Sequence, residues 1–135
     1  MHGYGERTVR TLIIGVALFT ASAGTAVGQD VQAGEASFRK CQACHDVGPD
    51  AKNKIGPMLN GVDGHKSGSV EGYSYTDANK NAGITWSEDT FKEYIKDPRA
   101  KMPGTKMIFP GIKEEKEAAD LWAYLAQFKS DGSKK

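Results

Sequence analysis

The sequence is poor in cysteine and histidine and has no convincing strand pattern. Its only cysteines are Cys41 and Cys44, and its only histidines are His2, His45 and His65. A structural zinc site needs four ligands, often with a second Cys/His pair, so this set suits one poorly. A thioredoxin-like redox motif needs a βαβ context, which the lack of strand patterns argues against. The length of 135 residues, without repeats, suits a single domain.

The sequence also lacks an apolar run of the usual membrane-spanning length. Its densest run, residues 12–19, is shorter than the ~20 residues that a spanning helix needs. Arg7 and Arg10 precede this run and small residues follow it, which is the order of a secretory signal peptide. We therefore expect a cleavable signal peptide over residues 1–28 and an exported, periplasmic domain over residues 29–135. Cleavage after Ala23 and an uncleaved membrane anchor are the alternatives.

Charge of neither sign dominates. The whole chain has 18 basic and 17 acidic side chains. Removal of residues 1–28 would leave 18 − 2 = 16 basic and 17 − 1 = 16 acidic side chains. This balance predicts no strong attraction to nucleic acid or to membranes, so any electrostatic steering must come from the arrangement of the lysines.

The chain does contain the segment Cys41-Gln42-Ala43-Cys44-His45, which is the C-x-x-C-H pattern that attaches c-type haem. The two thiols would lie on one side of a helical turn, where each can add across a haem vinyl group to form a thioether. The imidazole of His45 can then reach the iron of the same porphyrin. A simple disulfide is the alternative, but its two-residue spacer would constrain very little of the chain. The segment predicts one covalent haem with His45 as an axial ligand.

Helical patterns predict an all-α fold class. The first helix is expected from Val31 to Cys44, and the second from an N-cap at Ser87 to about Asp97, because Pro98 follows. Residues 46–86 are expected to be mostly irregular, which makes sense if they wrap a prosthetic group. The third helix is expected from Lys113 to Lys129, with one apolar face formed by Ala118, Leu121, Trp122, Leu125 and Phe128.

The second face of the iron is either open or closed by another side chain. The candidates are His65 and the methionines at positions 58, 102 and 107. Met58 lies close to His45 in the sequence and is expected on the same side, and His65 has no strong positional cue. Met102 and Met107 flank a turn that can form a strap over the far face, and their spacing does not separate them.

The run from Tyr75 to Trp86 and the run Pro103-Gly-Thr-Lys-Met-Ile-Phe109 resemble class I cytochromes c, most closely the mitochondrial-like bacterial cytochrome c2 group. The resemblance covers nearly all of residues 30–129. It implies the cytochrome c fold, with three main helices, haem-wrapping loops and crossing terminal helices. At that crossing, the packed residues would be Gly34, Phe38, Leu121 and Tyr124.

The resemblance also implies roles for individual residues. Met107 would be the sixth ligand, and the Pro57 carbonyl would accept a hydrogen bond from the distal ring nitrogen of His45. His65 stands where relatives commonly carry arginine near a haem propionate. Its protonation could make the haem potential depend on pH, or it could be a surface histidine without effect. A haem propionate would be bonded by Tyr75 and Trp86, and a polar network near Met107 would contain Asn79, Tyr94 and Thr105.

The implied function is one-electron transfer by a soluble, monomeric carrier rather than catalysis, because two ligands leave no iron site for a substrate. The implied partners are a bc1-type complex and a terminal oxidase or photosynthetic reaction centre. No nucleic-acid partner or stable membrane insertion after processing is expected. The alternatives are a peroxidase-like protein with a labile Met107 and a cytochrome subunit of a dehydrogenase. Docking would use Lys40, Lys54, Arg99, Lys101, Lys106 and Lys113, tempered by Glu114, Glu115 and Glu117.

Overall fold

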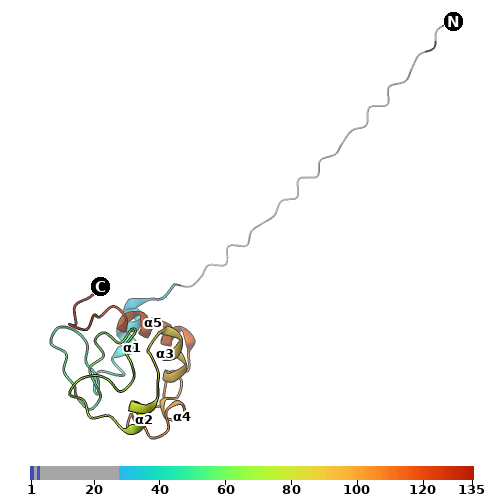
Figure 1. The fold of residues 1–135 in the computed structure, drawn as a ribbon. Coiled ribbons are helices and arrows are strands. Elements are labelled where there is room, and N and C mark those ends of the chain that lie inside the picture. Colours follow the sequence, from blue (N-terminus) through green and yellow to red (C-terminus); the bar gives the residue numbers. More distant parts are fainter. Residues whose placement is uncertain (2, 4–27) are drawn as a thin grey trace.

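The structure, a computed structural model, describes residues 1, 3 and 28–135. The expected signal peptide lies almost wholly outside these residues, so it stays a prediction. Among the described residues no helix is long and apolar enough to cross a membrane. The described part folds into five helices joined by long loops, which confirms the all-α class (Figure 1). They are α1 (Val31–Phe38), α2 (Asp77–Asn81), α3 (Glu88–Ile95), α4 (Pro98–Lys101) and α5 (Glu115–Leu125).

Helices α1 and α5 cross at one end of the molecule, as the resemblance implies (Figure 1). Gly34 is buried in α1, and a Cβ atom there would collide with the backbone of Asp120. The glycine therefore lets the two helices approach closely. Phe38 packs on Tyr124 with its ring centroid 5.5 Å away, and Leu121 is 1% exposed in the same core.

Two carboxylates of α5 add polar bonds to this crossing. Asp120, which is 4% exposed, accepts a hydrogen bond from the Asp30 N–H at 2.8 Å and pairs with Lys116 at 2.8 Å. Glu117 accepts a bond from the buried Ser37 hydroxyl at 2.6 Å. Lys40 and next the Ser37 hydroxyl hold the pKa of Glu117 below its usual value, and the Asp30 N–H bond and next Lys116 do the same for the pKa of Asp120. The crossing therefore depends partly on ionised carboxylates.

Helix α3 begins where the sequence predicts. The Ser87 hydroxyl accepts the Thr90 N–H at 3.3 Å, and the Thr90 hydroxyl accepts the Ser87 N–H at 2.8 Å, which forms a reciprocal cap. The expected end near Asp97 is confirmed to within two residues. Helix α4, which starts at Pro98, was not predicted from the sequence. A proline that cannot continue one helix can still occupy the first turn of the next, because the first N–H groups have no partner within the helix.

Two other expectations were wrong at the level of element boundaries. Helix α1 ends at Phe38, and residues 39–44 form successive turns instead of continuing it. Helix α5 is shorter than expected, with Glu115 and Leu125 as its ends. Residues 46–86 are mostly irregular, as expected, apart from the short helix α2, whose N-cap side chain accepts no backbone hydrogen bond. Such short elements are set by tertiary contacts more than by local signals.

Candidate functional site

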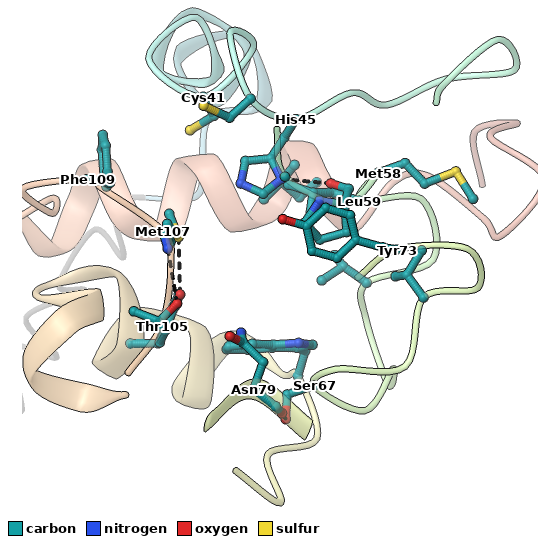
Figure 2. Close-up of a pocket in the computed structure, with 18 of the residues that line it drawn as sticks. Cys41, His45, Met58, Leu59, Ser67, Tyr73, Asn79, Thr105, Met107 and Phe109 are labelled. Atoms are coloured by element: carbon teal, nitrogen blue, oxygen red, sulfur yellow. Dashed lines mark hydrogen bonds between the residues drawn. The ribbon is translucent and has the colours of Figure 1, made fainter. Parts of the chain in front are cut away.

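A cavity of about 400 Å³ lies between the Cys41–His45 segment, helices α3 and α5, and the loops of residues 55–75 and 105–109. This volume falls within the range of about 300–1,000 Å³ that is usual for cofactor sites. His45 and Met107 reach the cavity from different sides, and Tyr73, Ser67 and Asn79 complete its wall (Figure 2). The sequence-predicted residues at 41, 44, 45, 57, 75, 79, 86, 94, 105 and 107 all line it.

His45 is buried and held in one orientation. Its Nδ1 atom lies 2.7 Å from the Pro57 carbonyl oxygen. Because a carbonyl can only accept a hydrogen bond, Nδ1 carries the proton and the lone pair of Nε2 is available. A Cβ atom at Gly56 would overlap the imidazole ring, so this glycine makes room for it. Burial lowers the pKa of His45, helped by Lys54 and opposed by the Pro57 bond, which favours the neutral imidazole that can bind a metal.

Cys41 and Cys44 are half-buried free thiols in the cavity wall. The Cys44 N–H donates to the Cys41 carbonyl at 3.0 Å, and the His45 N–H donates to the same carbonyl at 2.9 Å. Burial raises the pKa of the Cys41 thiol to about 11, although Lys40 acts in the opposite direction. The turn geometry thus brings both thiols and the imidazole to one cavity, as the sequence motif predicts.

Met107 is held by two polar neighbours. The Tyr94 hydroxyl donates to its Sδ atom at 3.1 Å, and its backbone N–H donates to the Thr105 hydroxyl at 3.2 Å. Tyr94 is 7% exposed, and burial raises the pKa of its hydroxyl while a bond with Thr105 opposes the rise. Met102 does not line the cavity and is buried beyond the end of α4. Met58 lies on the His45 side with its sulfur turned away from Met107 (Figure 2).

The polar part of the cavity wall is built by two paired segments. The Gly64 N–H donates to the Trp86 carbonyl at 2.8 Å, and the Trp86 N–H donates to the His65 carbonyl at 2.9 Å. These bonds fix His65 and Trp86 side by side at the cavity. Within the described part of the chain, the Nε2 atom of His65 is the one buried side-chain N or O atom without a hydrogen-bond partner. The cavity therefore suits a ligand that brings a polar group to this wall.

Asn79 makes its direct hydrogen bonds with Thr76 and Ser67. Its side-chain oxygen accepts the Thr76 hydroxyl at 2.9 Å, and its carbonyl accepts the Ser67 hydroxyl at 3.1 Å. Among the described residues, no hydrogen bond joins Asn79 to the group formed by Tyr94 and Met107. Two separate polar groups thus flank the cavity.

Sequence reasoning missed two contributors to this wall. Ser67 is 8% exposed, and no local signal marks it as a site residue. Gly68 has a φ of +70°, and a Cβ atom there would collide with the backbone of Asn79, so the loop and α2 can approach only with glycine at this position. The cluster of glycines in residues 56–72 was the available signal, but it does not show which glycine makes a close contact.

Tyr75 and the remaining donors complete the chemistry of the site. The Tyr75 hydroxyl accepts the Val70 N–H at 3.2 Å and keeps its own proton for donation into the cavity. Burial raises the pKa of this hydroxyl, so it stays neutral. With two thiols, a neutral imidazole and a thioether around one cavity, the residues present fit covalent haem. The fold and the site define a small helical protein that carries haem c.

The similarity of this chain to known proteins agrees with this class. A family model described as cytochrome c matches residues 31–129, and the chain belongs to the cytochrome c family. A cytochrome c2 of Blastochloris viridis is 55% identical over 127 residues, which cover 94% of this chain and all of that protein. A cytochrome c2 of Rhodoplanes tepidamans is 65% identical over 107 residues, which cover 79% of this chain and all of that protein.

A solved structure is also similar. Cytochrome cH from Methylobacterium extorquens matches with a TM-score of 0.67 and 46% identity, over 71% of this chain and 96% of that chain. The chain is therefore an electron carrier with covalent haem c held by Cys41 and Cys44, and not an enzyme. The peroxidase-like and dehydrogenase-subunit alternatives are not favoured by these relatives.

Proposed function

We propose that the chain carries single electrons with His45 and Met107 as the two axial ligands of its haem. The observation that carries this proposal is that the Nε2 atom of His45 and the sulfur of Met107 flank one cavity (Figure 2). The haem supplies a one-electron iron couple when it is bound, and His/Met ligation raises its reduction potential. A soft, neutral thioether favours ferrous iron, so Met107 stabilises the reduced carrier.

The neighbouring residues orient these ligands. The Pro57 carbonyl fixes the orientation of the His45 ring. It also makes the lone pair of Nε2 a stronger electron-pair donor to a metal. Tyr94 and Thr105 hold Met107 at the opposite part of the wall. Tyr75 and Trp86, as the resemblance implies, would bond a haem propionate, and the neutral Tyr75 hydroxyl suits that role because it retains a proton to donate.

We propose that redox partners dock at the cavity rim, by which we mean the exposed residues that line the cavity. These include Ile55 and Ile108, which are 75% and 89% exposed. Exposed apolar side chains of this size beside a cofactor cavity are typical of a contact surface. Lys106 also belongs to the rim, and Lys54 directly precedes Ile55. The rim thus combines an apolar centre with positive charge, which suits brief contacts with acidic partners.

The expected docking cations are not equivalent. Lys40 pairs with Glu117 at 2.5 Å and Lys101 pairs with Glu93 at 2.7 Å, so carboxylates offset both charges. The ammonium groups of the other lysines in the set donate to backbone carbonyls and remain uncompensated by those contacts. Lys54 bonds the Gln42 carbonyl at 2.5 Å, Lys106 bonds that of Ser74, and Lys113 bonds that of Lys96. We expect Lys54, Lys106 and Lys113 to contribute most to docking.

On this proposal the carrier works in the periplasm, between a bc1-type complex and a terminal oxidase or reaction centre. The test is the rate of electron transfer from a purified bc1-type complex as the salt concentration rises. We expect the rate to fall, because salt screens the attraction between exposed charges. Lys54→Gln should slow the reaction at low salt more than Lys101→Gln, whose charge is already offset. A rate that does not depend on salt, or equal effects of the two substitutions, would argue against this docking surface.

A further inference from the structure

Tyr73 contacts two segments of the proposed ligand site, one beside the His45 ring and one that carries Met107. Its hydroxyl donates to the Ile55 carbonyl at 2.6 Å, next to the Gly56 and Pro57 backbone that surrounds the His45 ring. The Lys106 ammonium lies over the Tyr73 ring, 4.5 Å from its centroid. Lys106 directly precedes Met107 in the chain. One aromatic side chain therefore touches the segment beside His45 and the segment that carries Met107.

Further contacts fix Tyr73 itself. Its ring meets Tyr75 edge-on, with centroids 4.7 Å apart. Asn53 links two loops. Its side chain donates to the Glu71 carbonyl at 3.0 Å and accepts the Met58 N–H at 3.0 Å. The Lys106 ammonium also donates to the Ser74 carbonyl. The loop of residues 70–75 is thus joined to the loop of residues 53–58 and to Lys106 by separate bonds.

The segment that carries Met107 is attached to the core at its far end by Ile112, which is 3% exposed and whose N–H donates to the Ile95 carbonyl at 2.8 Å, while Met107 and Phe109 are only partly buried against the core. Residues 102–114 contain no helix, and Ile108 is 89% exposed, so its side chain adds little packing. The Met107 contacts to Tyr94 and Thr105 are single hydrogen bonds. The Lys106 ammonium contacts both the Tyr73 ring face and the Ser74 carbonyl. Because both contacts favour the same position of the charge, together they hold Lys106 more firmly than either would alone.

We propose that Tyr73 and Lys106 form a clamp that keeps Met107 at the iron, which makes Tyr73 a positioning residue for the sixth ligand. This inference rests on the proposed ligation of the iron by Met107. The clamp joins the segment next to His45 to the segment of Met107, so it limits the movement of one proposed ligand segment relative to the other. Loss of the clamp makes Met107 easier to displace without removing any ligand.

Imidazole binding to the ferric holoprotein tests the clamp, because imidazole must displace Met107 to reach the iron. We expect Tyr73→Leu and Lys106→Met each to raise the binding constant about two- to five-fold, the size expected for an exposed cation–π contact. The double variant should bind little more tightly than either single variant, since both remove one shared contact. Tyr73→Phe keeps the ring under the ammonium and should have a smaller effect. Lys80→Met, which removes an equal charge from α2, should bind as the unaltered protein does.

The outcomes separate the clamp from the proposed function. A variant without the ligand, Met107→Ala, sets the binding expected of an open iron. If the unaltered protein binds imidazole as readily as Met107→Ala does, Met107 is not a ligand and the proposed function is wrong. If the unaltered protein resists imidazole but Tyr73→Phe, Tyr73→Leu and Lys106→Met all resist it equally, only the clamp is wrong. Should Tyr73→Leu fail to fold, Lys106→Met and Tyr73→Phe still decide the matter.

Discussion

At the scale of single residues, the Tyr94 hydroxyl is the side-chain group expected to affect the reduction potential most directly, because it bonds a proposed ligand atom. It donates to the Sδ atom of Met107 at 3.1 Å from a position that is 7% exposed. A hydrogen bond to the sulfur withdraws electron density from the thioether. Because ferric iron needs that density more than ferrous iron does, the bond favours the reduced state.

Tyr94→Phe should therefore lower the reduction potential of the haem. A net hydrogen bond of about 0.5–1 kcal/mol corresponds to roughly 20–40 mV for a one-electron couple. Voltammetry of the holoprotein measures this shift. Tyr124→Phe is the matched control, because that ring packs between Phe38 and Phe128. An unchanged or higher potential in Tyr94→Phe would show that the hydroxyl does not act on the ligand.

Much of the site could be predicted at this scale, because covalent attachment requires a short motif and a fixed order of residues. The motif at residues 41–45 and the strap before Met107 are both local in the sequence. The roles of Ser67 and Tyr73 could not be predicted, because they depend on contacts with Asn79 and Lys106. The hypothesis that His65 makes the haem potential depend on pH remains a prediction. The buried Nε2 atom of His65 does lie in the cavity wall.

At the scale of elements, the crossing of α1 and α5 depends on a position without a side chain. Gly34→Ala should destabilise the holoprotein although alanine favours helices by about 1 kcal/mol. The added Cβ atom would collide with the Asp120 backbone, and such overpacking typically costs about 1–3 kcal/mol. Urea unfolding measures the change. Glu35→Ala, at the next and exposed position, should change stability little; equal stabilities of the two variants would contradict the close approach.

The polar bonds of the same crossing predict a dependence on pH. The pKa of Asp120 is lowered chiefly by the Asp30 N–H bond and next by Lys116. A carboxyl with a lowered folded-state pKa stabilises the protein above its unfolded pKa of about 3.9, and this contribution is lost as the pH falls through the folded-state value. Asp120→Asn should therefore be less stable than the unaltered protein at pH 7, with a difference that shrinks below about pH 4.

Urea unfolding at several pH values tests this sign. Asp63→Asn is a suitable control, because Asp63 pairs with Lys135 at 3.1 Å on the surface, where such pairs contribute little. A difference between Asp120→Asn and the unaltered protein that stays constant from pH 7 to pH 3 would show that ionisation of Asp120 does not stabilise the crossing.

The elements themselves were predicted unevenly, for a physical reason. Helix α3 has a reciprocal cap at Ser87, and α5 has a continuous apolar face, so both carry strong local signals. Helices α2 and α4 have five and four residues, too few to show a helical period. The end of α1 at Phe38 was also missed, because the chain leaves the helix to present the thiols to the cavity rather than because of a helix-breaking residue.

At the scale of the whole molecule, the loops matter as much as the helices. Helices α3 and α5 form one part of the cavity wall, and the long loops supply Pro57, His65 and Met107 to the rest. The position of these loops therefore decides which side chains reach the cavity. The central claim is therefore that His45 and Met107, carried by separate segments, bind one iron from its two faces.

The proton NMR spectrum of the reduced holoprotein tests that claim most directly. A methionine that binds haem iron holds its methyl group over the porphyrin ring, whose ring current moves the methyl resonance far upfield. We expect one such resonance in the unaltered protein and in Met102→Leu, and its loss in Met107→Leu. A spectrum without it, or one in which Met102→Leu rather than Met107→Leu removes it, would contradict the account.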